Sequence, residues 1–222
     1  MRPMAFAVRL SVLGLVFAAS LASGCAGQDS APAGLHVEDD FSDCGGWSTD
    51  QDEVASFSCV DGGYRILVTG DGLVSRSSGR TLSTSVNALS VEADASYRAG
   101  PTFALYGVAC WAGEKGYTFA VSPGGDWTIS RDSPRAVLAE SDTEHAIAGL
   151  SDVNRIRGDC VGGQDATALT LYVNGKRIAT ATDGDGTALF TAFGFFVLTA
   201  RRGPDVRFDN VLARELTEAE VR

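Results

Sequence analysis

Two acidic residues, Glu92 and Asp94, form a candidate catalytic pair in this chain. The stretch 89–97 alternates apolar and polar residues, which predicts a strand with one face in the core and one in water. Both carboxylates then lie on the polar face, roughly 6–7 Å apart along the strand. A carboxylate pair flanking a sugar linkage can serve glycoside hydrolysis. The alternative is a solvated strand face, so Glu92 and Asp94 are candidates for catalysis or ligand binding.

A second acidic pair lies in the Asp-Gly-Asp-Gly segment at 183–186. Carboxylate oxygens in a loop suit calcium. The segment lacks the third acidic position and the distal Glu of an EF-hand, and a tight acidic turn between two strands explains it more simply. No cofactor is therefore expected, and calcium at Asp183 and Asp185 is the one alternative.

Tryptophans supply the candidate contacts to a sugar, because an aromatic ring can pack against the apolar face of a pyranose. Trp127 is expected on the same strand face as Ile129, which favours the core. Trp111 follows Cys110 at an expected strand end beside Gly113, which favours a rim position and a ligand. Burial in a sandwich core is the alternative for both rings.

Signatures of other enzyme classes are missing from the sequence. It has no Gly-x-Ser-x-Gly elbow, P-loop or dinucleotide fingerprint, and its two histidines, His36 and His145, are isolated. No complete catalytic set is present, which favours a protein that is not an enzyme.

The sequence predicts that these residues lie on or between β-strands. Short runs rich in Val, Ile, Phe, Tyr and Thr recur between Gly, Asp, Asn and Ser clusters, and Asn174-Gly175 favours a tight hairpin turn. This pattern predicts an all-β, two-sheet antiparallel sandwich. Strands are expected over 35–41, 53–59, 63–69, 72–76, 87–98, 102–111, 116–122, 126–131, 136–140, 153–159, 168–173, 176–182, 189–198 and 205–214. The run 190–198 is apolar throughout, which predicts a central strand.

Four cysteines in the sandwich region predict two disulfides in an exported protein. Three pairings are possible; the local closure of Cys44–Cys59 and a bridge between central strands by Cys110–Cys160 are favoured. A zinc site is disfavoured because no Cys-x-x-Cys spacing occurs.

The first residues predict export. Arg2 and Arg9 give a positive region before a short apolar stretch over 10–21, as in a secretory signal peptide. The segment Leu21-Ala22-Ser23-Gly24-Cys25 resembles the lipobox of bacterial lipoproteins, in which the cysteine is lipidated; ordinary cleavage is the alternative. The expected organisation is a signal peptide over 1–24, a tether over 25–34 anchored at Cys25, a β-sandwich over 35–215 and a short tail over 216–222.

The charge of the chain excludes some partners. Its formal charge is −10, and it becomes −12 without residues 1–24, which hold two Arg and no acid. Such a surface repels nucleic acid and anionic headgroups. Attachment to the extracytoplasmic face of the cell membrane must then come from the lipid on Cys25.

A set of motifs in fixed order carries a further resemblance. These are Asp40-Phe41, Trp47, Gly63-Tyr64-Arg65-Ile66, Tyr106-Gly107-Val108-Ala109-Cys110, Tyr117-Thr118-Phe119, Leu169-Thr170-Leu171-Tyr172-Val173-Asn174-Gly175 and Phe208-Asp209-Asn210-Val211. The set resembles concanavalin A-like (laminin-G-like) jelly rolls, especially exported bacterial relatives of 3-keto-disaccharide hydrolases. The resemblance covers 36–214 and implies ligands on a concave face or in rim loops.

The resemblance also bears on individual residues. Related glycosidases carry a Glu-x-Asp-x-x-Glu pattern; Glu92 and Asp94 match its start, but Tyr97 replaces the second Glu. Laminin-G-like domains often hold calcium at a rim, which is the context for Asp183 and Asp185. Apart from the resemblance, strand alternation places Asn210 on the side of Phe208, which favours a structural role; a ligand role is the alternative. We therefore expect a non-catalytic module that binds a glycan or an envelope protein, with a saccharide hydrolase or a structural envelope protein as alternatives.

Overall fold

The computed structural model describes residues 34–141, 153–186 and 189–221. The expected signal peptide, Cys25, almost all of the expected tether and His145 lie outside these residues. No helix in the described part of the chain is long and apolar enough to span a bilayer.

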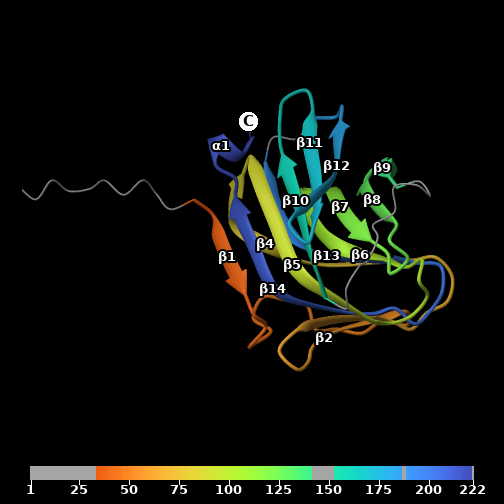
Figure 1. Cartoon of the computed structure of the whole chain (residues 1–222). Coiled ribbons are helices and arrows are strands. Elements are labelled where there is room, and N and C mark those ends of the chain that lie inside the picture. Colours follow the sequence, from red (N-terminus) through yellow and green to blue (C-terminus); the bar gives the residue numbers. More distant parts are fainter. Residues whose placement is uncertain (1–33, 142–152, 187–188, 222) are drawn as a thin grey trace, which may run out of the picture. The chain divides into compact units, whose positions relative to one another are not determined.

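Two antiparallel sheets form a sandwich, which confirms the predicted fold class (Figure 1). An eight-stranded sheet has the order β12 (Lys176–Asp183), β11 (Thr167–Val173), β10 (Val153–Val161), β5 (Ala88–Ala99), β14 (Asp205–Glu215), β3 (Tyr64–Val68) and β2 (Ala55–Cys59), with β1 (His36–Asp39) also beside β14. A six-stranded sheet has the order β4 (Val74–Val86), β13 (Phe190–Thr199), β6 (Leu105–Ala112), β7 (Lys115–Val121), β8 (Trp127–Arg131) and β9 (Ala136–Glu140). A short helix, α1 (Glu218–Val221), follows β14.

The core between the sheets is rich in stacked aromatic rings. Phe195 of β13 lies 4.2 Å from Phe208 of β14 and 4.8 Å from Trp47, measured between ring centroids. Trp47 and Phe208 come from opposite ends of the domain sequence, so this stack ties distant segments together by burial of large apolar surfaces.

Both favoured disulfide pairings are confirmed. Cys110 of β6 joins Cys160 of β10, so one bridge crosses the core between the two sheets. Cys44 joins Cys59 at the end of β2 and closes the segment that follows β1. The two bridges explain why the four cysteines of the sandwich lie in separate strands and loops.

The expected strand 72–76 is too short, because β4 runs from Val74 to Val86. Its residues beyond position 76 are mostly Ser, Thr, Arg and Gly, which do not show the apolar alternation of a half-buried strand. β4 is an edge strand that pairs with β13, and backbone pairing extends it where its side chains face water. The prediction of a central strand over 190–198 is confirmed, since β13 lies between β4 and β6.

The expected position of Asn210 is wrong. A β-bulge places three steps of β14, from Asp209 to Leu212, opposite two steps of β5. Asn210 is the extra residue, with a left-handed φ of 48°, and its side chain is exposed. Val211 takes the inward position next to Phe208 instead. Asn tolerates this backbone conformation better than most residues, which explains its use at the bulge.

Candidate functional site

Glu92 and Asp94 lie together on the outer face of the eight-stranded sheet, as the alternation of β5 predicts. Their neighbours Val91, Ala93 and Ala95 are buried in the core. Arg155 of β10 lies between the two carboxylates, with its Nε 3.2 Å from Glu92 and its Nη1 3.2 Å from Asp94. The pair is therefore already engaged by one guanidinium.

The bulge on β14 completes this cluster. The Arg155 Nη1 donates to the backbone oxygen of Asn210 at 2.8 Å, and the Asn210 amide donates to Asp94 at 2.9 Å. Burial would by itself lower the pKa of Arg155, but the adjacent carboxylates of Glu92 and Asp94 outweigh it and raise that pKa. Arg155 thus stays charged and fixes the position of both acids.

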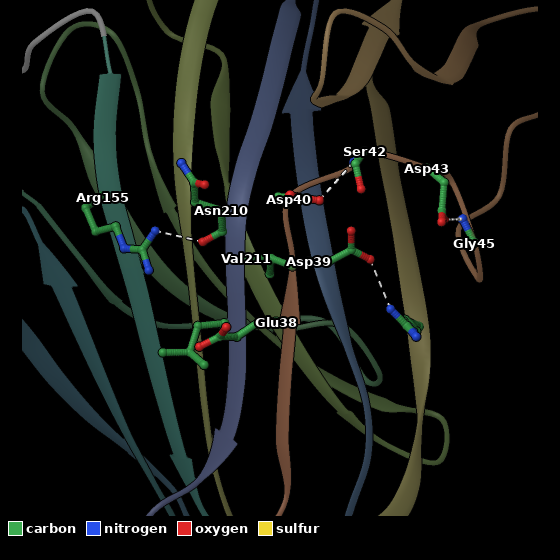
Figure 2. Close-up of a pocket in the computed structure, with 11 residues that line it drawn as sticks. Glu38, Asp39, Asp40, Ser42, Asp43, Gly45, Arg155, Asn210 and Val211 are labelled. Carbon is green, nitrogen blue, oxygen red and sulfur yellow. Dashed lines mark hydrogen bonds and ion pairs between the residues drawn. The ribbon is translucent and has the colours of Figure 1, made fainter.

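A cavity of about 760 Å³ adjoins this cluster (Figure 2). Arg155, Asn210 and Leu212 lie along one part of its lining, and Arg80 of β4 lies along another. The remaining lining residues come from β1 and the loop after it: Glu38, Asp39, Asp40, Ser42, Asp43 and Gly45, together with Val211 of β14. Four carboxylates and two guanidinium groups therefore surround this acidic cavity.

The loop after β1 orients the acids of the acidic cavity. The amide of Ser42 donates to Asp40 at 3.0 Å, and this bond together with one from the Ser42 hydroxyl lowers the pKa of Asp40. Asp39 accepts bonds from Arg80 at 3.0 Å and from the Trp47 indole at 2.9 Å. Asp39 therefore fixes the loop, whereas the exposed Asp40 has oxygen capacity left for a ligand.

The acidic cavity is suited to hydroxyl groups. Ionised carboxylates accept hydrogen bonds, the guanidinium of Arg155 and the amide of Asn210 donate them, and both kinds of group face one space. Its volume lies within the range of small-molecule pockets, about 300–1,000 Å³.

Trp111 lies elsewhere, so the structure does not bring the three predicted ligand-binding residues together. Cys110 points into the core, and the next residue of β6 therefore faces outward on the six-stranded sheet. The Trp111 indole donates a hydrogen bond to Asp132 and is half-buried above Gly79 and Gly116. Glu92 and Asp94 are on the opposite outer face of the sandwich.

The predicted acidic turn at Asp183 and Asp185 holds an arginine. The Arg131 Nη1 lies 2.7 Å from Asp183 and 2.9 Å from Asp185, and the Tyr117 hydroxyl donates to Asp183 at 2.9 Å. Burial would raise the pKa of Asp183, but the bonds from Tyr117, the Asp185 amide and Arg131 lower it. Within the ranges that the structure describes, no three His, Cys, Asp or Glu side chains are placed to hold a metal ion.

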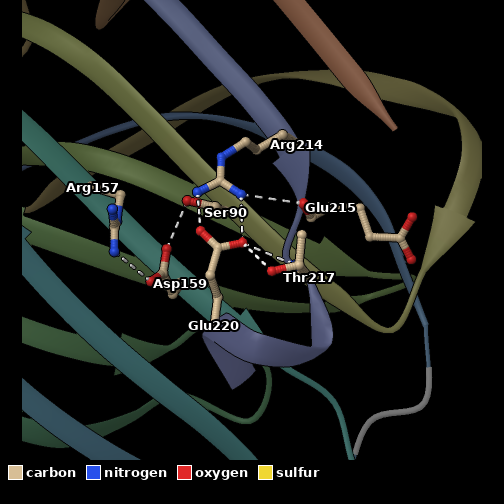
Figure 3. A network of polar contacts seen from close by, with 7 residues as sticks. All are labelled: Ser90, Arg157, Asp159, Arg214, Glu215, Thr217 and Glu220. Carbon is tan, nitrogen blue, oxygen red and sulfur yellow. Dashed lines mark hydrogen bonds and ion pairs between the residues drawn. The ribbon is translucent and has the colours of Figure 1, made fainter. Parts of the chain in front are cut away.

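A polar network that the sequence did not reveal lies at one end of the outer face of the eight-stranded sheet (Figure 3). Asp159 of β10 is buried and accepts bonds from the Ser90 hydroxyl at 2.7 Å and from Arg157 at 3.0 Å. Near it, Arg214 of β14 pairs with Glu220 of α1. The alternation of residues 89–97 predicts that Ser90 faces water. Ser90 is buried instead, because Asp159 of β10 covers it, and the pattern of a single strand cannot show such a neighbour.

The fold of this sandwich occurs in known proteins. No protein-family model matches the sequence, and no curated protein sequence matches it. A Bacillus subtilis protein of unknown function with a galectin-like fold has a TM-score of 0.58 at 11% identity, over 82% of this chain and 96% of that one. The sandwich therefore has a jelly-roll fold similar to that of this Bacillus subtilis protein. Carbohydrate-binding module CBM66 from Bacillus subtilis has a TM-score of 0.51 at 16% identity, over 77% of this chain and 96% of that one.

A sialidase is also similar, with a TM-score of 0.54 and 15% identity. The match covers 82% of this chain but only 18% of the sialidase. At these identities the likeness shows the jelly-roll fold alone, and the function must be argued from the site.

Proposed function

We propose that this protein is a non-catalytic carbohydrate-binding module that a lipid on Cys25 holds at the extracytoplasmic face of the cell membrane. The main support is the acidic cavity, where Asp40, Arg155 and Asn210 present acceptors and donors to one space. Hydroxyl-rich ligands need both kinds of group. The jelly-roll likeness to a carbohydrate-binding module agrees with this use of the fold.

The anchor rests on the sequence. Cys25 ends a lipobox-like segment, and the predicted sandwich begins about ten residues later. The lipidated protein should partition with membranes, and Cys25→Ser should release it into the soluble fraction. Mass spectrometry of the mature N-terminus checks the modification itself. A mature protein without a lipid on Cys25 would contradict the anchor.

A hydrolase acting on a saccharide is the alternative that Glu92 and Asp94 suggest. Retaining and inverting glycosidases both need one carboxyl group that donates a proton and one free to attack or activate water. Arg155 engages both acids here, and Asn210 adds a further bond to Asp94. These contacts favour ligand binding over acid/base catalysis.

The test is binding of the full chain, purified in mild detergent, to a glycan array and to isolated envelope polysaccharides. Asp40→Asn removes the charge of an exposed acceptor of the acidic cavity and should weaken retention several-fold, because hydrogen bonds to a charged acceptor are stronger than those to a neutral one. Glu114→Gln, an exposed change in the turn between β6 and β7, is the matched control. If Trp111→Ala lost binding and Asp40→Asn bound as well as the wild type, the binding site would instead lie on the six-stranded sheet.

Turnover is measured in the same samples. If the protein released sugar from a bound glycan and Glu92→Gln abolished that release, the module would be an enzyme. Retention by envelope proteins and by no glycan would replace the carbohydrate with a protein partner.

A further inference from the structure

Three arginines converge on a second, smaller cavity of the same outer face. Its volume is about 180 Å³, and its lining residues are Val60, Asp61, Arg65, Arg98, Asp205 and Arg207. Arg65 and Arg207 are direct cross-strand partners on β3 and β14, where like charges repel. Arg98 comes from β5, on the other side of β14.

Existing contacts satisfy only part of this positive charge. Arg65 forms a two-pronged bond with Asp205, at 2.8 and 2.7 Å. Arg207 donates to the backbone oxygen of Asp61 and lies 3.6 Å from Asp209. Among the described residues, the Arg98 side chain has neither a hydrogen bond nor an ion pair, and it is exposed.

The local backbone leaves room for the Arg207 side chain over this cavity. Gly63, in the turn that precedes β3, lies directly under the Arg207 side chain, and a Cβ atom there would overlap its Nε. A larger residue at position 63 would therefore compete with the Arg207 side chain for this space. Three guanidinium groups and two carboxylates line this arginine pocket, with Asp209 also near Arg207, in a chain whose overall charge is −10.

We propose that the arginine pocket binds an oxyanion, a carboxylate or a sulfate or phosphate ester, carried by an acidic sugar. Arginine forks match the planar or tetrahedral oxygens of these groups. The volume is below that of a pocket for a whole drug-sized ligand, which fits a single substituent. Identification of the carrier as a sugar rests on the proposed function.

The two cavities together define the class of glycan. Arg207 precedes Asn210 of the acidic cavity by three residues of β14, roughly 10 Å of strand, and both positions face outward. Four carboxylates in the acidic cavity repel a second anionic group. The preferred ligand therefore has one isolated acidic substituent next to neutral hydroxyl-bearing units, and a polyanion is disfavoured.

Binding of D-glucuronate and D-glucose to the full chain tests this proposal, since the two sugars differ in one carboxylate. The first should bind more tightly, and added salt should remove the difference. Arg98→Gln should weaken D-glucuronate binding about ten-fold, as expected for the loss of one charge-assisted bond, and leave D-glucose unchanged. Arg177→Gln, the same change at an exposed site on β12, is the control. Sulfate, acetate and an acidic tetrapeptide are measured as competitors of D-glucuronate.

The outcomes separate this inference from the proposed function. Equal binding of both sugars would leave the carbohydrate function standing and overturn the arginine pocket. Unchanged D-glucuronate affinity in Arg98→Gln, or no D-glucuronate binding to the wild type, would overturn it as well. Tetrapeptide binding without sugar binding would replace the saccharide with an acidic protein segment. Competition by sulfate and not by acetate would assign the oxyanion to an ester group, and the reverse result to a carboxylate.

Discussion

Arg214 of β14 and Glu220 of α1 form a two-pronged ion pair, with nitrogen–oxygen distances of 2.6 and 3.0 Å (Figure 3). Glu220 also accepts bonds from the backbone amide and the hydroxyl of Thr217, both at 2.9 Å. One carboxylate thus caps the start of α1 and attaches the helix to the sheet. The short helix has no buried residue, so these bonds take the place of apolar packing.

Glu220→Ala should release α1 from the sheet. The expected loss in unfolding free energy is only about 0.5–1 kcal/mol, because the pair is partly exposed. Faster hydrogen exchange at the Val221 amide, which donates to the Thr217 carbonyl, would report the release. The bonds from Arg214 and Thr217 lower the pKa of Glu220 to about 2, so its stabilisation is full above pH 4.5 and is lost as the pH falls toward 2. An unchanged exchange rate in Glu220→Ala, with Glu114→Ala as the control, would contradict this role.

Asp159 should give the opposite pH dependence. Burial raises its pKa above 3.8, and the bonds from Ser90 and Arg157 only partly oppose this. An acid with a raised folded pKa stabilises the fold most at a pH below 3.8, and this contribution is lost as the pH rises through the folded pKa. Urea unfolding of Asp159→Asn should no longer show this dependence of the unfolding free energy on pH. An NMR titration of the wild type should show the raised pKa of Asp159. A pKa below 3.8 in the folded protein would refute the interpretation.

Arg131→Leu should destabilise the fold, because it leaves the buried Asp183 without its cation. Asp183 and Arg131 are only 5% and 13% exposed as side chains, so water cannot replace the lost partner. Thermal or urea unfolding measures the change against Arg177→Gln.

The same ion pair predicts how the protein responds to calcium. With Arg131 between Asp183 and Asp185, neither calcium nor a chelator should shift the unfolding midpoint of the wild type. A clear rise in the midpoint with calcium would show that a cation competes with Arg131.

Asn210 allows the backbone and side-chain roles of the bulge to be separated. Asn210→Gly should keep the left-handed conformation and change the unfolding free energy by less than about 0.5 kcal/mol, whereas Asn210→Val should cost about 1–2 kcal/mol. If both variants were equally stable, the conformation of residue 210 would not be under strain.

The local pattern of the sequence predicted most of the sandwich. Alternation identified the inward face of β5, and a continuous apolar run identified β13 as central. The polar half of β4 was missed because its pairing with β13, and not its own side chains, makes it a strand. Asn210 was misplaced for a similar reason: one bulge reverses the faces of the residues after it, and nothing in the local sequence marks it.

The candidate site could be predicted only in part. Glu92 and Asp94 share a face because they are two residues apart on one strand. Their partner Arg155 lies on β10, which is not adjacent to β5 in the sequence, so its position depends on the register between distant strands. The arginine pocket likewise combines β3, β5 and β14. A site formed by strands that are distant in the sequence cannot be predicted from the local pattern of a single amino-acid sequence.

The pairing of β1 with β14 has a mechanical consequence for an anchored protein. His36 lies opposite Arg214, whereas Arg207 and the arginine pocket lie toward the other end of β14. Tension between an anchor before β1 and a ligand held at that far end would pull β1 along its own axis. The hydrogen bonds between β1 and β14 run perpendicular to this axis. A pull along the strand would therefore load all of them simultaneously, in shear, and would not break them one after another. The first strand would therefore hold the module under flow or cell movement.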